Sequence, residues 1–187
     1  MELLLSIFLG IGLSAACGFR IFVPFLIMSI ASLSGHFRLS PGFAWIGTYP
    51  ALISFATATV LEITGYYIPW LDNLLDTIAA PAAIIAGTIA MASIALDMSP
   101  FLKWTLAIIA GGGTAALFQG TTTLVRGTST ATTGGLGNFA IASAEAGVSA
   151  LLSLFAIALP IFTVVVIIVA ACFILRKRFK RLTTKNT

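Results

Sequence analysis

Residues 15–26, AACGFRIFVPFL, place an arginine, Arg20, inside the first long hydrophobic run of the chain. Of the 187 residues, 59% are hydrophobic and only 9% are charged. A soluble protein carries roughly 25% charged residues, so this chain could not cover a surface that faces water. The composition therefore predicts an integral membrane protein, and the fold must accommodate a permanent cation at membrane depth.

Five apolar runs predict an all-α, polytopic membrane helix bundle. They cover about residues 3–33, 43–65, 74–96, 101–124 and 139–175. A helix needs about 20 residues to cross the hydrocarbon core, so the middle three runs fit one crossing each. The first and last runs are too long for one straight crossing and too short for two. Broken or re-entrant helices are expected there, with breaks at Gly18 and Pro24 in the first run and at Pro160 in the last. Pro81 is a further predicted break, in the third run.

The chain is predicted to hold one transmembrane domain, residues 1–175, and a basic tail, residues 176–187. The tail, RKRFKRLTTKNT, is expected in the cytoplasm of a bacterium, as the terminus of a multi-pass inner-membrane protein. Glu2 stands where a secretory signal would be basic, which argues against a cleaved leader. Counting back through five crossings places Lys103 inside, and Glu2, Asp72 and Arg126 outside.

The order of polar residues and prolines suggests an internal duplication. Each half of the chain has an arginine after a run of small residues, then a glutamate in helical sequence, then a proline in an apolar run. The two sets are Arg20, Glu62 and Pro81, and Arg126, Glu145 and Pro160. Such an order predicts six elements in a 3+3 repeat as an alternative to five crossings, with residues 138–150 re-entrant.

Arg20 is expected to face the protein interior and to pair with Glu62 or Glu145, because an arginine at the centre of a membrane helix costs roughly 2.5–3.5 kcal/mol. Two interpretations stay open. The ion pair is structural, or the arginine binds an anionic or polar solute in a cavity. Arginine keeps its proton at working pH, so it would anchor a solute and not carry protons. A carboxyl group such as Glu62 could be proton-coupled.

Two further segments carry polar residues. Asp72 and Asp76 stand four residues apart, hence on one helical face, and are interpreted as a helix cap or as carboxylates that attract a cation at a vestibule. Residues 118–138 contain seven threonines and five glycines. This segment is interpreted either as a pore-lining or re-entrant loop, with Gln119, Arg126 and Asn138 facing a solute, or as a flexible external loop.

Enzyme chemistry finds little support in the sequence, and intramembrane modification of a lipid is the remaining enzymatic alternative. His36 is the only histidine and has no acid nearby. Cys17 and Cys172 lie within apolar runs and are expected to pack as small hydrophobes. No metal, cofactor or nucleic-acid partner is predicted. The expected partners are the lipid bilayer, a small polar or anionic solute and, as a minor alternative, a second copy of the chain.

The motifs AACGFRIFVPFL, YYIPWLDNLLDTIAAP and NFAIASAEAGVSALLSLFAIALP resemble those of the domain-of-unknown-function family numbered 4126. The resemblance extends from about residue 5 to residue 174. It implies a membrane fold and no particular chemistry, because the family has no established activity. The positions that match recurrent polar and turn residues of the family are Gly18, Arg20, Pro24, Asp72, Asp76, Pro81, Arg126, Asn138 and Glu145.

The sequence thus favours a small transporter or channel-like protein with a charged site at the membrane midplane. The alternative is a scaffold or assembly factor that does not transport and uses the same ion pairs only to hold its helices. The residues predicted to form the site are Arg20, Glu62, Gln119, Arg126, Asn138 and Glu145.

The predicted topology places positions 72 and 103 on opposite sides of the membrane. Single cysteines there, in a chain freed of Cys17 and Cys172, should react with a membrane-impermeant reagent from opposite sides. Labelling of both positions from the same side would contradict the five-crossing count.

Overall fold

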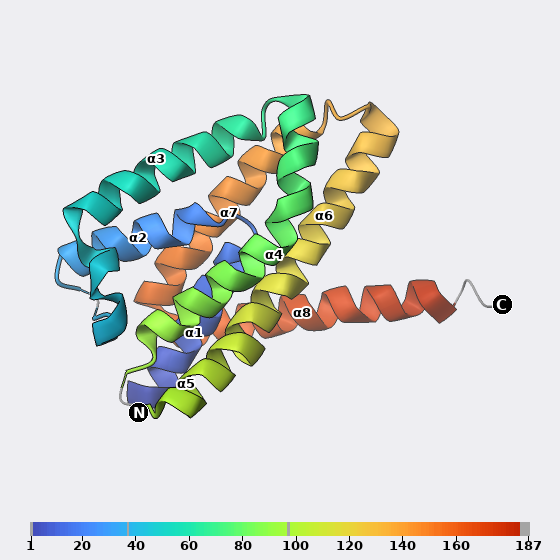
Figure 1. Ribbon diagram of the computed structural model, residues 1–187. Helices are drawn as coiled ribbons and strands as arrows, with labels where there is room; N and C mark the ends of the chain where they lie inside the picture. The colour runs from blue at the N-terminus through green and yellow to red at the C-terminus, as the bar shows by residue number, and fades with distance from the viewer. Residues whose placement is uncertain (1, 37, 97, 184–187) are drawn as a thin grey trace.

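The computed structural model describes residues 2–36, 38–96 and 98–183, and every regular element in these ranges is a helix (Figure 1). The predicted all-α class is confirmed. The helices are α1 (Glu2–Cys17), α2 (Phe22–Leu33), the 3₁₀ helix η1 (Pro41–Gly47), α3 (Tyr49–Gly65), α4 (Pro69–Ile94), α5 (Pro100–Leu106), the π-helical η2 (Ala107–Gly112), α6 (Gly113–Thr133), α7 (Asn138–Ala158) and α8 (Pro160–Thr183).

Three helical segments are long and apolar enough to cross a membrane: Leu74–Ile94, Pro100–Thr133 and Asn138–Ala158. A fourth span is reached if η1 and α3, which meet at 66°, count as one broken crossing. The apolar part of α8, like α1 and α2, is shorter than the about 20 residues that a crossing needs. The chain is therefore a multi-pass membrane protein in which short helices accompany the long ones.

The first apolar run breaks where Gly18 and Arg20 stand, because α1 ends at Cys17 and α2 begins at Phe22. Pro24 does not break a helix, contrary to expectation. It lies in the first turn of α2, where backbone N–H groups lack intrahelical partners and proline removes nothing.

The two later prolines differ from each other. Pro81 lies inside α4, which continues past it and changes direction along its length in Figure 1, as proline-containing helices do. Pro160 begins α8 directly after α7 has ended, so the predicted break there is present. The last apolar run is therefore one full-length helix, α7, followed by the shorter apolar part of α8, Pro160–Ile174.

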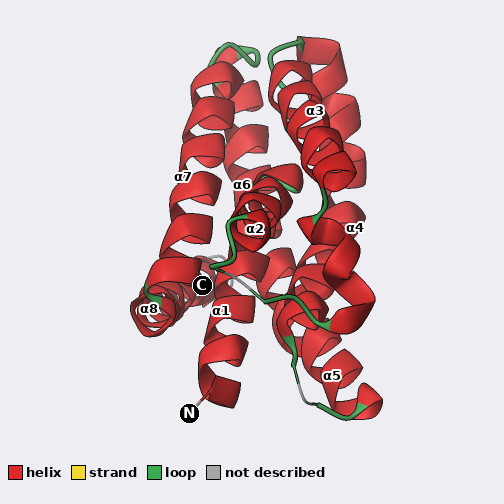
Figure 2. Ribbon diagram, turned by 90° about the vertical axis from the view of Figure 1, so that its left-hand side faces the viewer, coloured by secondary structure: helices red, strands yellow, loops and turns green. Residues whose placement is uncertain are grey.

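The start of α1 lies at the same end of the bundle as α5 (Figures 1 and 2). Ile7 packs there with Met91 and Leu106, which come from the end of α4 and from α5. The prediction that Glu2 and Lys103 lie on opposite sides is therefore wrong. The physical reason is that α1 ends after 16 residues and α2 leaves it in a new direction, so the first run does not cross as one helix.

The threonine-rich segment is neither a pore loop nor a flexible loop over most of its length. It forms the second half of α6, and only Gly134–Gly137 make a turn before α7. Threonine hydroxyls bond the carbonyl four residues earlier, as Thr121 does to Leu117 and Thr128 to Leu124. Threonine satisfied in this way is compatible with a helix at membrane depth. Residues 138–150, expected to be re-entrant, belong to the continuous helix α7.

Small residues bring three helices into close contact beneath the break in the first run. A Cβ atom on Gly87 of α4 would lie 2.9 Å from the carbonyl oxygen of Gly111 in η2. Ser14 of α1 donates a hydrogen bond to the Gly87 carbonyl at 2.8 Å. This is the packing that glycine and serine allow between membrane helices, where backbones approach closely and hydroxyls bridge them.

Gly18→Ala should destabilise the protein, because the new Cβ would lie 2.7 Å from the Ala115 carbonyl oxygen and 2.8 Å from Phe118 Cβ. We expect a loss of about 1–3 kcal/mol, measured by thermal unfolding in detergent. Gly113→Ala is the matched control, because a Cβ there meets nothing within 4 Å. A Gly18→Ala protein as stable as this control would show that α1 and α6 do not approach so closely.

Candidate functional site

A buried ionic network joins the break between α1 and α2 to α4, α6 and α7. Arg126 is its centre and is 2% exposed. Its Nε donates to Glu145 Oε1 at 3.1 Å, and its Nη2 bonds Glu145 Oε2, which makes the pair bidentate. Its Nη1 donates to Asp72 Oδ1 at 2.6 Å and lies 3.5 Å from Asp76 Oδ1. One guanidinium thus meets three carboxylates, from α4 and α7.

Arg20 reaches the same network from the break in the first run. It is 1% exposed, and its Nη2 lies 3.3 Å from Glu145 Oε2 and donates to the Ala142 carbonyl at 2.9 Å. Its Nε and Nη1 are buried without a hydrogen-bond partner among the described residues. The predicted proximity of Arg20 to Glu145 is therefore present, and Glu145 is shared between two arginines.

The ring of Tyr66 contacts both guanidinium groups. The Cζ atom of Arg20 is 3.9 Å from the ring centroid, and that of Arg126 is 4.0 Å from it. Tyr66 is the residue that follows α3 and is buried. Contact with an aromatic face stabilises a cation, so the ring offsets part of the repulsion between two like charges. Because Arg20 has two unpartnered nitrogens, this contact matters more for Arg20 than for Arg126.

Glu62 does not pair with Arg20 as one alternative predicted. From α3, its Oε1 accepts a hydrogen bond from the Ile21 N–H at 2.8 Å, and its Oε2 accepts one from the Phe22 N–H at 3.1 Å. The carboxylate thus caps the N-terminus of α2, where free N–H groups and the helix dipole favour a negative charge. Sequence reasoning looked for a cation and overlooked the backbone donors that the helix break creates.

Asp72 and Asp76 belong to the network, where the sequence suggested a cap or an open vestibule. Asp72 lies in the first turn of α4 and is 3% exposed, but the residue before the helix is Ile68, so Asp72 is not its cap. Asn138 Nδ2 donates to Asp72 Oδ2 at 2.7 Å and to Thr130 Oγ1 at 3.0 Å. Asn138 therefore holds the side of Asp72 that Arg126 does not reach.

Gln119 does not join this network. It is buried on α6, and its Nε2 lies 3.4 Å from Thr123 Oγ1 on the same helix. Tyr66 is the functional residue that sequence reasoning missed as a site member, because two adjacent tyrosines at the end of a helix are typical of an interfacial aromatic belt. The sequence did contain one signal of its place in the site, because Tyr66 stands four residues after Glu62, which is itself a predicted site residue.

The network lies nearer to one end of the bundle than to its middle. Asn138 is the first residue of α7, and Glu145 lies seven residues further along that helix. At 1.5 Å per residue this distance is about 10 Å, against a hydrocarbon core of about 30 Å. The two arginines of the predicted repeat also have unlike settings, because Arg20 lies between helices and Arg126 lies inside α6. This difference does not favour a duplication.

Two cavities adjoin the network and share one residue, Tyr66. The first has a volume of about 140 Å³ and lies under the turn between α6 and α7. Its lining is Tyr66, Tyr67, Asp72, Gly134, Gly135, Leu136, Asn138 and Phe139. The second has a volume of about 430 Å³ and lies between α3 and α4. It is largely apolar, and Glu62 is the only charged residue among those known to line it.

Fold and site together define a class: an all-α, multi-pass membrane protein with a buried charged network. More particularly, the chain belongs to the family described as Domain of unknown function (DUF4126), which matches residues 7–179. The resemblance seen in the sequence motifs is thereby confirmed, and the match includes every residue of the network. No curated protein and no solved structure matches the chain. Among the described residues, no group of three or more His, Cys, Asp or Glu side chains could hold a metal ion.

Arg126→Met should destabilise the protein more than Arg20→Met, because it leaves three carboxylates without their shared cation. We expect about 3–5 kcal/mol for Arg126→Met. The cost of Arg20→Met should be clearly smaller, because Glu145 keeps its bidentate partner. Arg38→Met, at an exposed position, is the matched control and should change little.

Unfolding in detergent, followed by circular dichroism, measures these differences. Adding Glu145→Met to Arg126→Met should recover part of the loss, which a double-mutant cycle reports as coupling of about 1–3 kcal/mol. Equal costs for the two arginines would contradict the central place of Arg126.

Proposed function

We propose that the protein moves a small polar solute through the membrane, as a transporter or a channel-like protein, along a path that passes Tyr66. The observation that carries this proposal is the position of Tyr66, which lines both cavities. A cavity at one end of the bundle, a second cavity between α3 and α4 and a side chain common to both are the parts from which such a path would be built.

The contacts of Tyr66 suggest how passage would be controlled. Two guanidinium groups lie within 4.0 Å of the centroid of its ring. Arginine does not lose its proton, so these groups act as fixed anchors. Opening the path requires that the ring leave at least one guanidinium, and a bound solute that compensates the lost contact would lower that cost. In this mechanism Glu62 offers a carboxylate in the second cavity.

The scaffold alternative has its own support. The bidentate contact of Arg126 with Glu145 and the Asp72–Asn138 hydrogen bond tie α4, α6 and α7 together. A network whose only purpose was to brace helices would make such contacts. It would not need two cavities that share an aromatic side chain. Nothing in the geometry calls for bond-making chemistry, so we assign the protein a binding role and not an enzymatic one.

We further propose that the turn between α6 and α7 faces outward and that the basic tail is cytoplasmic. The four candidate spans carry the main crossings in this arrangement. Helices α1 and α2 form a broken pair that enters from the side of Lys103 and does not cross as one helix. The beginning of the chain is then on the cytoplasmic side with α5, which is supported by the packing of Ile7 and Leu106 against the same buried cluster of Met91, Ala92 and Ala107.

Cysteine accessibility tests the proposed path. In a Cys17→Ala, Cys172→Ala background, Ala82→Cys, in the second cavity, should react with a charged, water-soluble thiol reagent. Ile85→Cys, on the same helix but 59% exposed on the outer face of the protein, is the matched control. It should stay inert, because lipid excludes the reagent. Tyr66→Ala should speed the reaction at position 82 several-fold, whereas Tyr66→Phe, which keeps the ring, should not.

The two functions differ in this experiment. If position 82 is as inert as position 85, both with Tyr66 and with Tyr66→Ala, no aqueous path reaches the second cavity and the scaffold is favoured. The Tyr66→Phe protein shows whether a change in reactivity comes from the ring or from a loss of folding.

A further inference from the structure

We infer that the first cavity binds a small alkylated ammonium ion that carries at least one N–H group. This inference deepens the proposed function, because it names the class of solute that the path would admit. The first observation is the formal charge of the ionic network. Three carboxylates, Asp72, Asp76 and Glu145, meet two guanidinium groups in the network, so its formal charge is −1. Buried negative charge without a counter-ion is costly, so the site favours a cation.

Asn138 gives the second, independent observation. The amide is 5% exposed and lines the first cavity. Its orientation is fixed, because Nδ2 must face the carboxylate of Asp72 and Thr130 Oγ1. The other amide atom, Oδ1, is then an acceptor, and it has no hydrogen-bond partner among the described residues. A buried acceptor left unpaired costs free energy, so a ligand that donates a hydrogen bond at this position would be favoured.

The remaining lining selects the kind of cation. Three aromatic side chains line the cavity with Asp72 and Asn138, and two of them, Tyr67 and Phe139, pack with ring centroids 4.4 Å apart. Aromatic faces attract alkylated ammonium groups, which are recognised in this way in proteins. A bare metal ion would need a shell of oxygen ligands in place of these rings. The volume of about 140 Å³ suits a group of a few heavy atoms.

An anionic solute, which the sequence left open, fits this cavity less well. Neither arginine lines it, and the one charged residue known to line it is Asp72. The cavity also lies at the end of the bundle where the turn between α6 and α7 is exposed, with Leu136 87% exposed. A cation can therefore enter from the water at this end and stop above Tyr66.

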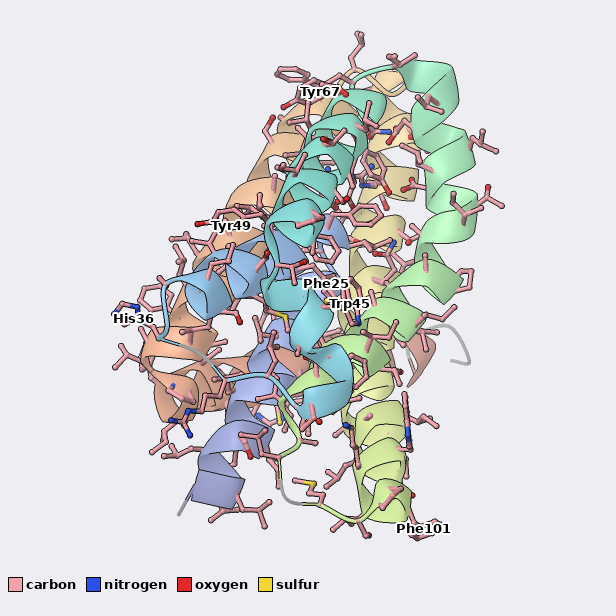
Figure 3. The ribbon with its side chains drawn as sticks, turned by 60° about the vertical axis from the view of Figure 1, so that its left-hand side comes forward. Phe25, His36, Trp45, Tyr49, Tyr67 and Phe101 are labelled. Carbon is pink, nitrogen blue, oxygen red and sulfur yellow. The ribbon has the colours of Figure 1, made fainter. Side chains whose placement is uncertain are left out.

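The test uses trimethylammonium as the probe and the purified full chain in detergent, with calorimetric titration as the readout. tert-Butanol has nearly the same shape without the charge, and tetramethylammonium has the charge without an N–H group. We expect trimethylammonium to bind most tightly of the three. Phe139→Leu and Tyr67→Leu should each weaken its binding by roughly fivefold, as the loss of one cation–π contact predicts. Phe101→Leu, at the opposite end of the bundle from Tyr67 (Figure 3), is the matched control and should change nothing.

Several results would overturn the inference. The first is binding of trimethylammonium no tighter than that of tert-butanol, and the second is binding that neither ring variant weakens. The third is displacement of bound trimethylammonium by sodium chloride at the same concentration as the probe. An absence of binding at neutral pH, together with stabilisation by acid alone, would show that protons compensate the charge instead. Uptake of the probe into proteoliposomes separates the two proposals. Binding without uptake keeps the site and rejects transport, whereas uptake that survives both ring variants keeps transport and rejects the site.

Discussion

The contact between Arg126 and Glu145 is the interaction on which the rest of the structure depends. It joins α6 to α7, and through Asp72 the same guanidinium holds the start of α4. Glu145 then holds Arg20 at the break of the first run. Removing the cation would strand carboxylates on two helices at once, in a medium that solvates them poorly. The network therefore fixes the relative positions of helices that apolar packing alone would leave free to slide.

The same network explains why a long apolar run breaks where it does. Arg20 cannot remain on the surface of a straight helix that faces lipid. Ending α1 at Cys17 lets the arginine turn inward, and Gly18 permits the close approach to α6 that this turn requires. The break exposes the N–H groups of Ile21 and Phe22, and Glu62 accepts both. The burial of Arg20 and the capping of α2 by Glu62 are thus both consequences of the same helix break.

Sequence reasoning predicted the membrane class, the helical fold and the buried state of Arg20, and it named Glu145 as the second candidate partner of that arginine after Glu62. It was less successful where tertiary context overrides composition. Threonine and glycine suggested a loop at residues 118–138, but hydroxyls that bond their own helix make threonine acceptable in α6. The role of Glu62 depends on backbone donors that exist only once α2 has formed beside α3. The place of Tyr66 depends on two arginines that lie 106 residues apart in sequence, a proximity no local pattern encodes.

The cap that Glu62 provides has a mechanical meaning. Because both oxygens of this α3 side chain hold the first N–H groups of α2, these helices are coupled at one end, and η1 links them at the other. They form a closed loop of three helical segments. Tyr66 lies one residue beyond α3, at the end of this loop where Glu62 couples the two helices. A small tilt of the three segments as one body would therefore move the ring relative to the arginines without unfolding any helix.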